Sequence, residues 1–140
     1  MDEIYVYALL CSAGFDELLN FESVLNELFL KNPDNDEFLD LMGRSDKDTL
    51  LHVLSLMNTH PLDQDHFGRC FMSALKPIYF AESLHEFYKC TSKLWTLLPE
   101  DLRYTEPFFI LGYADEPLDY GDEKTCRELY QKALNYFSGR

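Results

Sequence analysis

The sequence predicts an all-α protein, an antiparallel array of about seven or eight short helices packed as an irregular bundle or loosely like an α-solenoid. Apolar residues recur at three- and four-residue spacing in most segments. Proline and glycine mark the segment ends, and no segment alternates apolar and polar residues as a half-buried strand would. The 140 residues, 46% hydrophobic and 15% aromatic, suit one folded unit. We therefore expect a single helical domain over residues 1–140.

The first segment, residues 2–13, mixes strand-favouring residues with helix-favouring ones. Its two leading acids suit a helix N-terminus, and we interpret it as a helix ending at Gly14. Residues 16–30 carry a clear amphipathic pattern that ends before Asn32-Pro33, because a residue preceding proline avoids the α region. Residues 33–43 begin a short helix with Pro33 in its first turn.

The later helices are each bounded by a cap or a proline. Residues 48–58, capped by Ser45, are nearly all apolar and are expected to form the most buried helix. The next helix is expected over residues 64–75, with Asp63 as its cap and an interruption at Lys76-Pro77. Another is expected over residues 80–98, where Pro99 ends it. The last two are expected over about 106–113 and over 123–138, the latter closed by Gly139.

The net charge of −13 bears on the kind of partner the chain can bind. Affinity for phosphates and for anionic membrane surfaces comes from lysine and arginine, so both partners are disfavoured. The net charge is unevenly distributed along the chain. It is −9 over residues 1–48, zero over residues 49–99, −7 over residues 100–123 and +3 over residues 124–140. Two acidic blocks favour a basic partner. The alternative is that acidity only keeps the protein in solution.

The cysteines and the N-terminus bear on the compartment. None of the four cysteines forms a C-x-x-C pair, and each lies in an apolar or helical run, which favours free buried thiols in a reducing cytosol. The chain starts with two acids where a secretory signal carries positive charge. No apolar run approaches the ~20 residues of a membrane span. We expect a cytoplasmic protein.

The candidate functional stretch is residues 99–123, which contains eight carboxylates and only one base, Arg103. Three prolines and two glycines favour an irregular backbone, and the apolar block at 107–111 is expected to pin it to the core. Acids interleaved with tyrosines suit a protein-binding surface, although tyrosines also lie half-buried at core edges. The expected partner-binding residues are Tyr104, Tyr113, Asp115, Glu116, Asp119, Tyr120 and Asp122.

Motifs for catalysis or metal binding are absent from the sequence. His66 and Cys70 could share a helix face, but no second ligand pair stands near them. The acids at 34–37 fail the spacing of a calcium loop and suit the first turn of a helix. We expect no enzyme, no cofactor and no metal site. A helical enzyme or metal-site protein is the third-ranked alternative.

Three segments carry a resemblance to a known class of proteins: FLKNPDNDEFLDLM, DTLLHVLSLMNTH and SKLWTLLPEDL. Together they resemble an all-helical immunity protein family of bacterial polymorphic toxin and contact-dependent growth inhibition systems, although the order of Trp95 and Leu98-Pro99 differs from that family's pattern. The resemblance implies a bacterial cytosolic protein that binds and neutralises a cognate toxin domain, often a nuclease with a basic cleft. The alternative within the binding class is an acidic mimic of nucleic acid that blocks a DNA- or RNA-binding protein.

Overall fold

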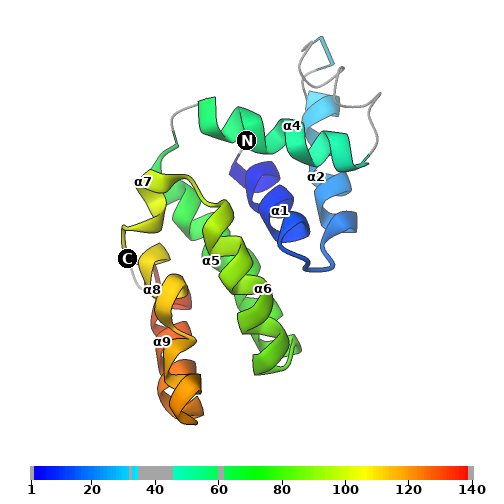
Figure 1. The fold of residues 1–140 in the computed structure, drawn as a ribbon. Coiled ribbons are helices and arrows are strands. Elements are labelled where there is room, and N and C mark those ends of the chain that lie inside the picture. Colours follow the sequence, from blue (N-terminus) through cyan, green and yellow to red (C-terminus); the bar gives the residue numbers. More distant parts are fainter. Residues whose placement is uncertain (1, 32, 35–45, 60–61, 139–140) are drawn as a thin grey trace. The chain divides into compact units, whose positions relative to one another are not determined.

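The computed structural model describes residues 2–31, 33–34, 46–59 and 62–138, and all regular structure in these ranges is helical (Figure 1). Eight α-helices and one 3₁₀-helix lie in the described residues, with no strand among them. The all-α prediction is therefore confirmed. The helix expected over residues 33–43, the break at His60-Pro61 and the end at Gly139 lie largely or wholly outside the described residues.

The chain divides into two compact units, Met1–Leu62 and Asp63–Arg140, and each is described by itself. The expectation of a single domain over residues 1–140 stays a prediction.

The first unit is built around α1 (Asp2–Ser12), which packs against both α2 (Leu18–Lys31) and α4 (Asp46–Thr59). The helical interpretation of residues 2–13 is confirmed. A helix enclosed on more than one side must be apolar around most of its circumference, which explains its mixed sequence pattern. Gly14 follows α1 with a φ of +102°, a conformation that favours glycine. The buried residues of α1 are Ile4, Tyr5, Val6, Ala8, Leu9 and Leu10.

The expectation that the helix after Ser45 is the most buried one is wrong. In α4 the described buried side chains are Thr49, Val53 and Met57, whereas Leu51 is 57% exposed. These three residues are spaced four apart, which places them on one stripe facing α1. Although α4 is apolar around most of its circumference, only one of its faces is buried, because its main described neighbour, α1, lies on one side.

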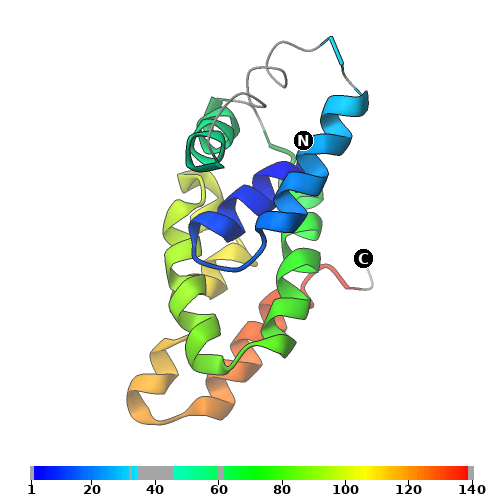
Figure 2. The same cartoon turned by 90° about the vertical axis from the view of Figure 1, so that its right-hand side faces the viewer.

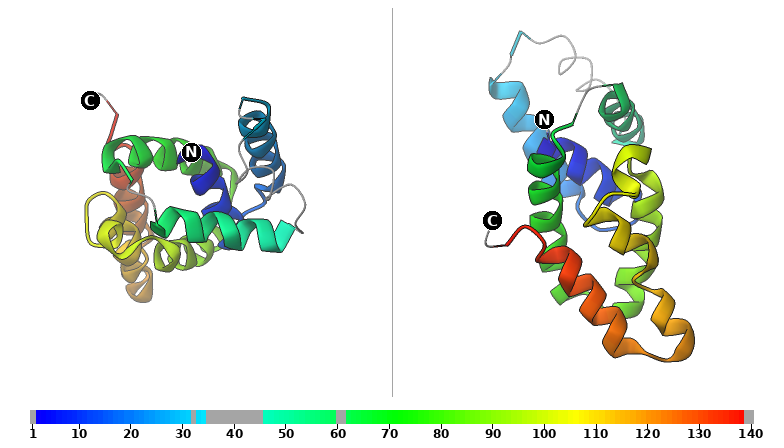
Figure 3. Two further views of the ribbon diagram at one scale, coloured as in Figure 1. Left: turned by 90° about the horizontal axis from the view of Figure 1, so that it is seen from above. Right: turned by 90° about the vertical axis from the view of Figure 1, so that its left-hand side faces the viewer.

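Six helices lie in residues 63–138 of the second unit: α5 (Gln64–Ala81), α6 (Leu84–Leu97), α7 (Glu100–Arg103), α8 (Phe108–Tyr113), the 3₁₀-helix η1 (Glu116–Tyr120) and α9 (Glu123–Leu134). Helices α5 and α6 form an antiparallel hairpin (Figure 2). Helices α8 and α9 lie side by side and are joined at one end by η1 (Figure 3). The core of this unit includes two ring clusters. They are Phe67, Phe71 and Phe108, and Tyr79, Phe87 and Tyr130.

One helix start and one helix end of this unit fall where the sequence predicts them. The Asp63 carboxylate accepts the amides of Asp65 and His66 at 3.0 and 3.2 Å, as expected for the start of α5. Pro99 follows α6, whose C-cap Leu98 is extended at ψ 149°.

The predicted interruption at Lys76-Pro77 is wrong, because α5 continues through Pro77 to Ala81. Proline removes one hydrogen bond and crowds the preceding turn. Buried side chains lie on both sides of it, with Leu75 before and Ile78 and Tyr79 after, so packing holds the helix across the proline. Helix α6 consequently starts at Leu84, after the cap Ser83, and not near residue 80.

The stretch 99–123 is more regular than expected. Besides α8, which matches the predicted short helix, it contains α7 and η1. Helix α9 ends at Leu134, four residues before the predicted end, and turns follow it. The candidate stretch is therefore a series of short helices held against α6 and α9.

Candidate protein-binding surface

The seven expected partner-binding residues lie in the second unit and fall into two groups. Tyr104 and Tyr113 belong to a chain of ring contacts that we name the aromatic row, defined as Trp95, Tyr104, Phe109 and Tyr113. The other five lie on the acid–tyrosine turn, defined as residues 115–122. They are Asp115, Glu116, Asp119, Tyr120 and Asp122.

Within the acid–tyrosine turn, η1 presents two carboxylates and one ring to solvent. In a 3₁₀-helix, side chains three residues apart lie on the same face, so Glu116 and Asp119 share a face of η1. Both are exposed, and Tyr120 beside them is 89% exposed. Gly121 ends η1 at a φ of +73°, and its amide donates to the Leu118 carbonyl at 3.0 Å. This tight end holds the exposed ring next to the acids.

Asp115 is placed differently from its neighbours, because it is half-buried. Burial raises the pKa of the Cys126 thiol to about 11, and the nearby Asp115 carboxylate adds to the rise. Burial also raises the pKa of the fully buried Tyr130, and the neighbouring Cys126 and Asp115 add to the rise. Asp115 therefore acts electrostatically on the interior side of α9 as well as on solvent, and is less available to a partner than Glu116 or Asp119.

Asp122 has a structural role as the N-cap of α9. Its carboxylate accepts the Thr125 amide at 3.1 Å and the Thr125 hydroxyl at 2.6 Å. These hydrogen bonds lower the pKa of Asp122. Its assignment as a partner contact stays a prediction, and the geometry explains the residue without one.

The aromatic row is a continuous series of four rings. Ring centroids lie 6.0 Å apart between Trp95 and Tyr104, 6.3 Å between Tyr104 and Phe109, and 5.3 Å between Phe109 and Tyr113. Tyr104 is 65% exposed and Phe109 is 43% exposed, while Trp95 and Tyr113 are half-buried.

Sequence reasoning missed Phe109, which was expected in the core with the rest of residues 107–111. Phe108, Ile110 and Leu111 are buried, and Phe109 lies on the outer side of the same short helix. Trp95, on the apolar stripe of the helix before Pro99, is half-buried. The signal that could have found Phe109 is helical periodicity, because a run of four apolar residues covers more than one turn and cannot face one side only.

Trp95 is fixed in place from several directions. Its indole N–H donates to the Arg103 carbonyl at 3.2 Å, and the Arg103 guanidinium carbon lies 5.8 Å from the ring centroid. Gly112 leaves room for the ring, since a Cβ there would stand 2.7 Å from Trp95 Cε2. The row is thus built on a rigid base formed by α6, α7 and α8.

A shallow groove of about 390 Å³ adjoins the acid–tyrosine turn. Leu118 of η1 forms part of its wall, and the ion pair between Arg127 and Glu123, 2.8 Å apart, forms another part. The remaining lining residues are Leu84, His85 and Tyr88. The groove gives the turn an apolar and aromatic border on its α6 side.

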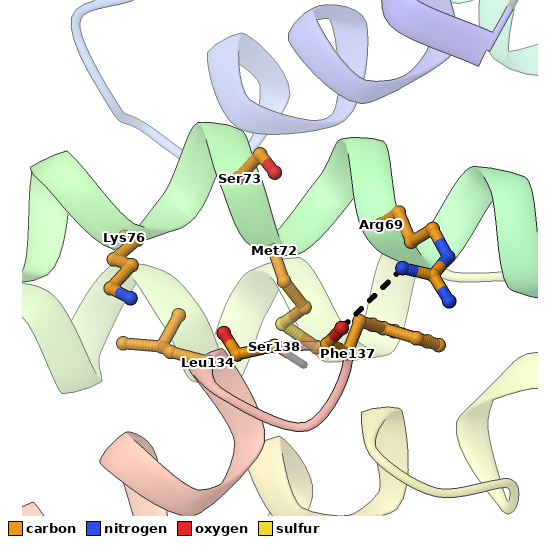
Figure 4. Close-up of a pocket in the computed structure, with 7 residues that line it drawn as sticks. All are labelled: Arg69, Met72, Ser73, Lys76, Leu134, Phe137 and Ser138. Carbon is orange, nitrogen blue, oxygen red and sulfur yellow. Dashed lines mark hydrogen bonds between the residues drawn. The ribbon is translucent and has the colours of Figure 1, made fainter. Parts of the chain in front are cut away.

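A second groove, of about 260 Å³, lies between α5 and the turns after α9 (Figure 4). Arg69 Nη1 donates to the Phe137 carbonyl at 3.4 Å, and Lys76 Nζ donates to Asn135 Oδ1 at 2.7 Å. The Phe137 ring packs over Gly68, where a Cβ would stand 2.6 Å from it. These contacts use both cations to hold the turn after α9 onto α5, so we assign this groove a structural role.

The described residues offer neither a metal site nor a membrane-spanning helix. Among the described residues, no three histidine, cysteine, aspartate or glutamate side chains are grouped so as to hold a metal ion. None of the helices in the described ranges combines the length and apolar character needed to cross a membrane.

Comparison of the chain with protein-family models, curated proteins and solved structures gave no match in any of the three.

Proposed function

We propose that this protein is an immunity protein that binds and neutralises a cognate bacterial toxin domain of basic character, such as a nuclease. The observation that carries the proposal is the acid–tyrosine turn, where the 89% exposed ring of Tyr120 stands beside the exposed carboxylates of Glu116 and Asp119. The turn lies in the segment 100–123, whose net charge is −7. An exposed ring beside exposed carboxylates is poorly suited to a purely solubilising surface.

The two side-chain types would contribute differently to binding. Carboxylates raise the rate of encounter with a basic surface and orient it. Tyrosine supplies apolar area with few rotatable bonds, and a tyrosine at the centre of an interface contributes roughly 2 kcal/mol or more. Acids on the rim and a ring at the centre would therefore block a basic substrate cleft without any chemistry in this chain.

The proposal includes a cytoplasmic location, a protein partner, and no cofactor or enzymatic activity. A bacterial cell must hold such an inhibitor where the toxin acts, and a toxin with a nucleic-acid substrate acts in the cytoplasm. The net charge of −13 supports a basic protein partner over nucleic acid itself.

Affinity capture tests the proposal. The chain is tagged at its C-terminus and expressed in its source organism, and co-purified proteins are identified. We expect one stoichiometric basic partner whose expression alone kills cells and whose toxicity this protein relieves. A non-toxic DNA- or RNA-binding protein as the stoichiometric partner would contradict the immunity function and support nucleic-acid mimicry. Absence of any stoichiometric partner would contradict both.

A further inference from the structure

We propose that the aromatic row is a binding site for arginine side chains presented by a basic protein partner. This inference deepens the proposed function, on which it rests for the identity of the partner. It adds one specific claim, that the aromatic row binds guanidinium groups more tightly than ammonium groups of equal charge.

The first support is the geometry of the exposed rings. Tyr104 and Phe109 are neighbours at 6.3 Å, and both are substantially exposed. The ring centroids of Phe109 and Tyr113 lie 5.3 Å apart, so the ring faces available to a ligand belong to one continuous surface. A guanidinium is planar and weakly hydrated, and stacks on such faces, whereas an ammonium keeps its water shell.

The second support is that the row already holds a guanidinium. Arg103 places its guanidinium carbon 5.8 Å from the Trp95 ring centroid. Its Nε is buried and has no hydrogen-bond partner among the described residues, so the ring contact is a main feature of its placement. No cation in the described part of the chain lies over Tyr104 or Phe109. The Trp95 end of the row is therefore occupied internally, and the two exposed rings are open to an arginine from outside.

The third support is charge, which also decides among possible occupants. The segment around the row carries eight carboxylates and one base, and Glu100, Asp101 and Glu106 are exposed within it. A second copy of this chain would bring another net charge of −13 and be repelled. A basic segment satisfies both the acids and the rings, because arginine supplies charge and a stacking plane in one side chain.

The leucines exposed in the first unit provide a contrast. Leu19 and Leu30 on α2 are also large and exposed. An aliphatic side chain has no π face, so it offers a guanidinium no specific attraction. Acids beside leucines attract arginine and lysine about equally, whereas acids beside rings should prefer arginine.

The test uses two synthetic probes of equal length and charge, nona-arginine and nona-lysine, titrated calorimetrically into the full chain near physiological ionic strength. We expect nona-arginine to bind at least about fivefold more tightly, the preference that two exposed cation–π contacts provide. Amide chemical shifts should change around residues 104–113 with nona-arginine, and much less with nona-lysine.

The decisive variant is Tyr104→Leu with Phe109→Leu, which keeps apolar volume and removes the π faces. Phe80→Leu is the matched control, because Phe80 is 70% exposed and lies on α5, outside the row. We expect the arginine preference to fall below about twofold in the double variant and to persist in the control. Should the double variant not fold, Phe109→Leu alone must still reduce the preference.

Equal dissociation constants for the two peptides in the unchanged chain, or a preference that survives the double variant, would overturn the inference. Its failure is distinguishable from failure of the proposed function. Charge reversal by Glu116→Lys with Asp119→Lys should weaken the binding of both peptides to the same extent. The ratio of their two dissociation constants should therefore stay unchanged. If the ratio depends on the rings but no toxin is captured, the proposed function fails and the arginine site stands.

Discussion

The two acidic blocks of this chain have similar charge but very different surfaces. Residues 1–48 carry twelve acids and three bases, and those in α2 lie on a regular amphipathic helix. Residues 100–123 carry eight acids and one base on short helical pieces, with Tyr104, Phe109 and Tyr120 exposed among them. The exposed large apolar residues described in the first unit are leucines.

This difference shows that charge alone does not define the candidate surface. A regular amphipathic helix places its acids opposite its core face, and such a face can simply be solvated. Short helices separated by turns cannot bury every apolar residue of a dense sequence, so rings remain outside beside the carboxylates. We therefore propose that a partner binds the second block and not the first.

The largest expected effect is on the core beneath the second block. Phe87 lies between Tyr79 at 5.1 Å and Tyr130 at 4.9 Å and is fully buried. Phe87→Ala should reduce the free energy of unfolding by about 3–5 kcal/mol, because the lost ring leaves a cavity. Urea denaturation followed by circular dichroism measures this. A loss under about 1 kcal/mol would show that these rings do not form the core described.

The next largest effect concerns the base of the aromatic row. Gly112→Ala would place a methyl group 2.7 Å from Trp95, and should destabilise the chain by about 1–3 kcal/mol through overpacking. Glycine-to-alanine changes inside helices otherwise stabilise by roughly 0.5–1 kcal/mol, so the sign is diagnostic. Because Trp95 is the only tryptophan, its fluorescence should shift with the change. A more stable variant with an unchanged spectrum would contradict the packing of Trp95 on α8.

A smaller effect is expected at the cap of α9, with a defined pH dependence. Hydrogen bonds from Thr125 lower the folded-state pKa of Asp122 below its ordinary value of 3.8. The stabilisation is therefore fully present above the unfolded pKa, and is lost as the pH falls through the folded value. Asp122→Ala should lower Tm near neutral pH, and by progressively less as the pH falls through the folded-state pKa of Asp122.

Asp122→Asn is the matched variant for this cap. It keeps a capping oxygen, and its Tm should lie between those of the other two proteins near neutral pH. A Tm difference between wild type and Asp122→Ala that stays constant down to acid pH would contradict the capping role.

The smallest effect on stability is expected at the centre of the proposed surface. Tyr120→Ala should change the free energy of unfolding by no more than about 0.5 kcal/mol, because the ring is 89% exposed. The same change should weaken partner binding, since tyrosine is the expected anchor. A large loss of stability would show that Tyr120 serves the fold and would remove the main observation for binding.

Local chemistry made part of this structure predictable. Asp63 and Pro99 affect only the backbone within a few residues, where one starts a helix and the other ends one. Both of the helix boundaries that they predict are confirmed. Pro77 misled the prediction because long-range packing of Leu75, Ile78 and Tyr79 outweighs the cost of proline in α5. The exposure of Leu51 depends on which helices lie beside α4, and no pattern within the helix encodes that.

The candidate surface was predictable only as a segment. The run of acids and tyrosines located residues 99–123, but the sequence does not reveal that Asp122 caps α9 or that Asp115 is half-buried beside it. The aromatic row joins Trp95 to Phe109 across α6 and α8, and such a contact arises from tertiary packing.

The most direct test of the central claim compares the two acidic blocks with the captured partner. Glu116→Lys with Asp119→Lys reverses two exposed acids on η1, and Asp16→Lys with Glu27→Lys reverses two exposed acids of the first unit by the same total charge. The dissociation constant should rise at least about tenfold for the first pair and less than about threefold for the second. Equal losses, or a larger loss for the first-unit pair, would contradict the assignment of binding to the second block.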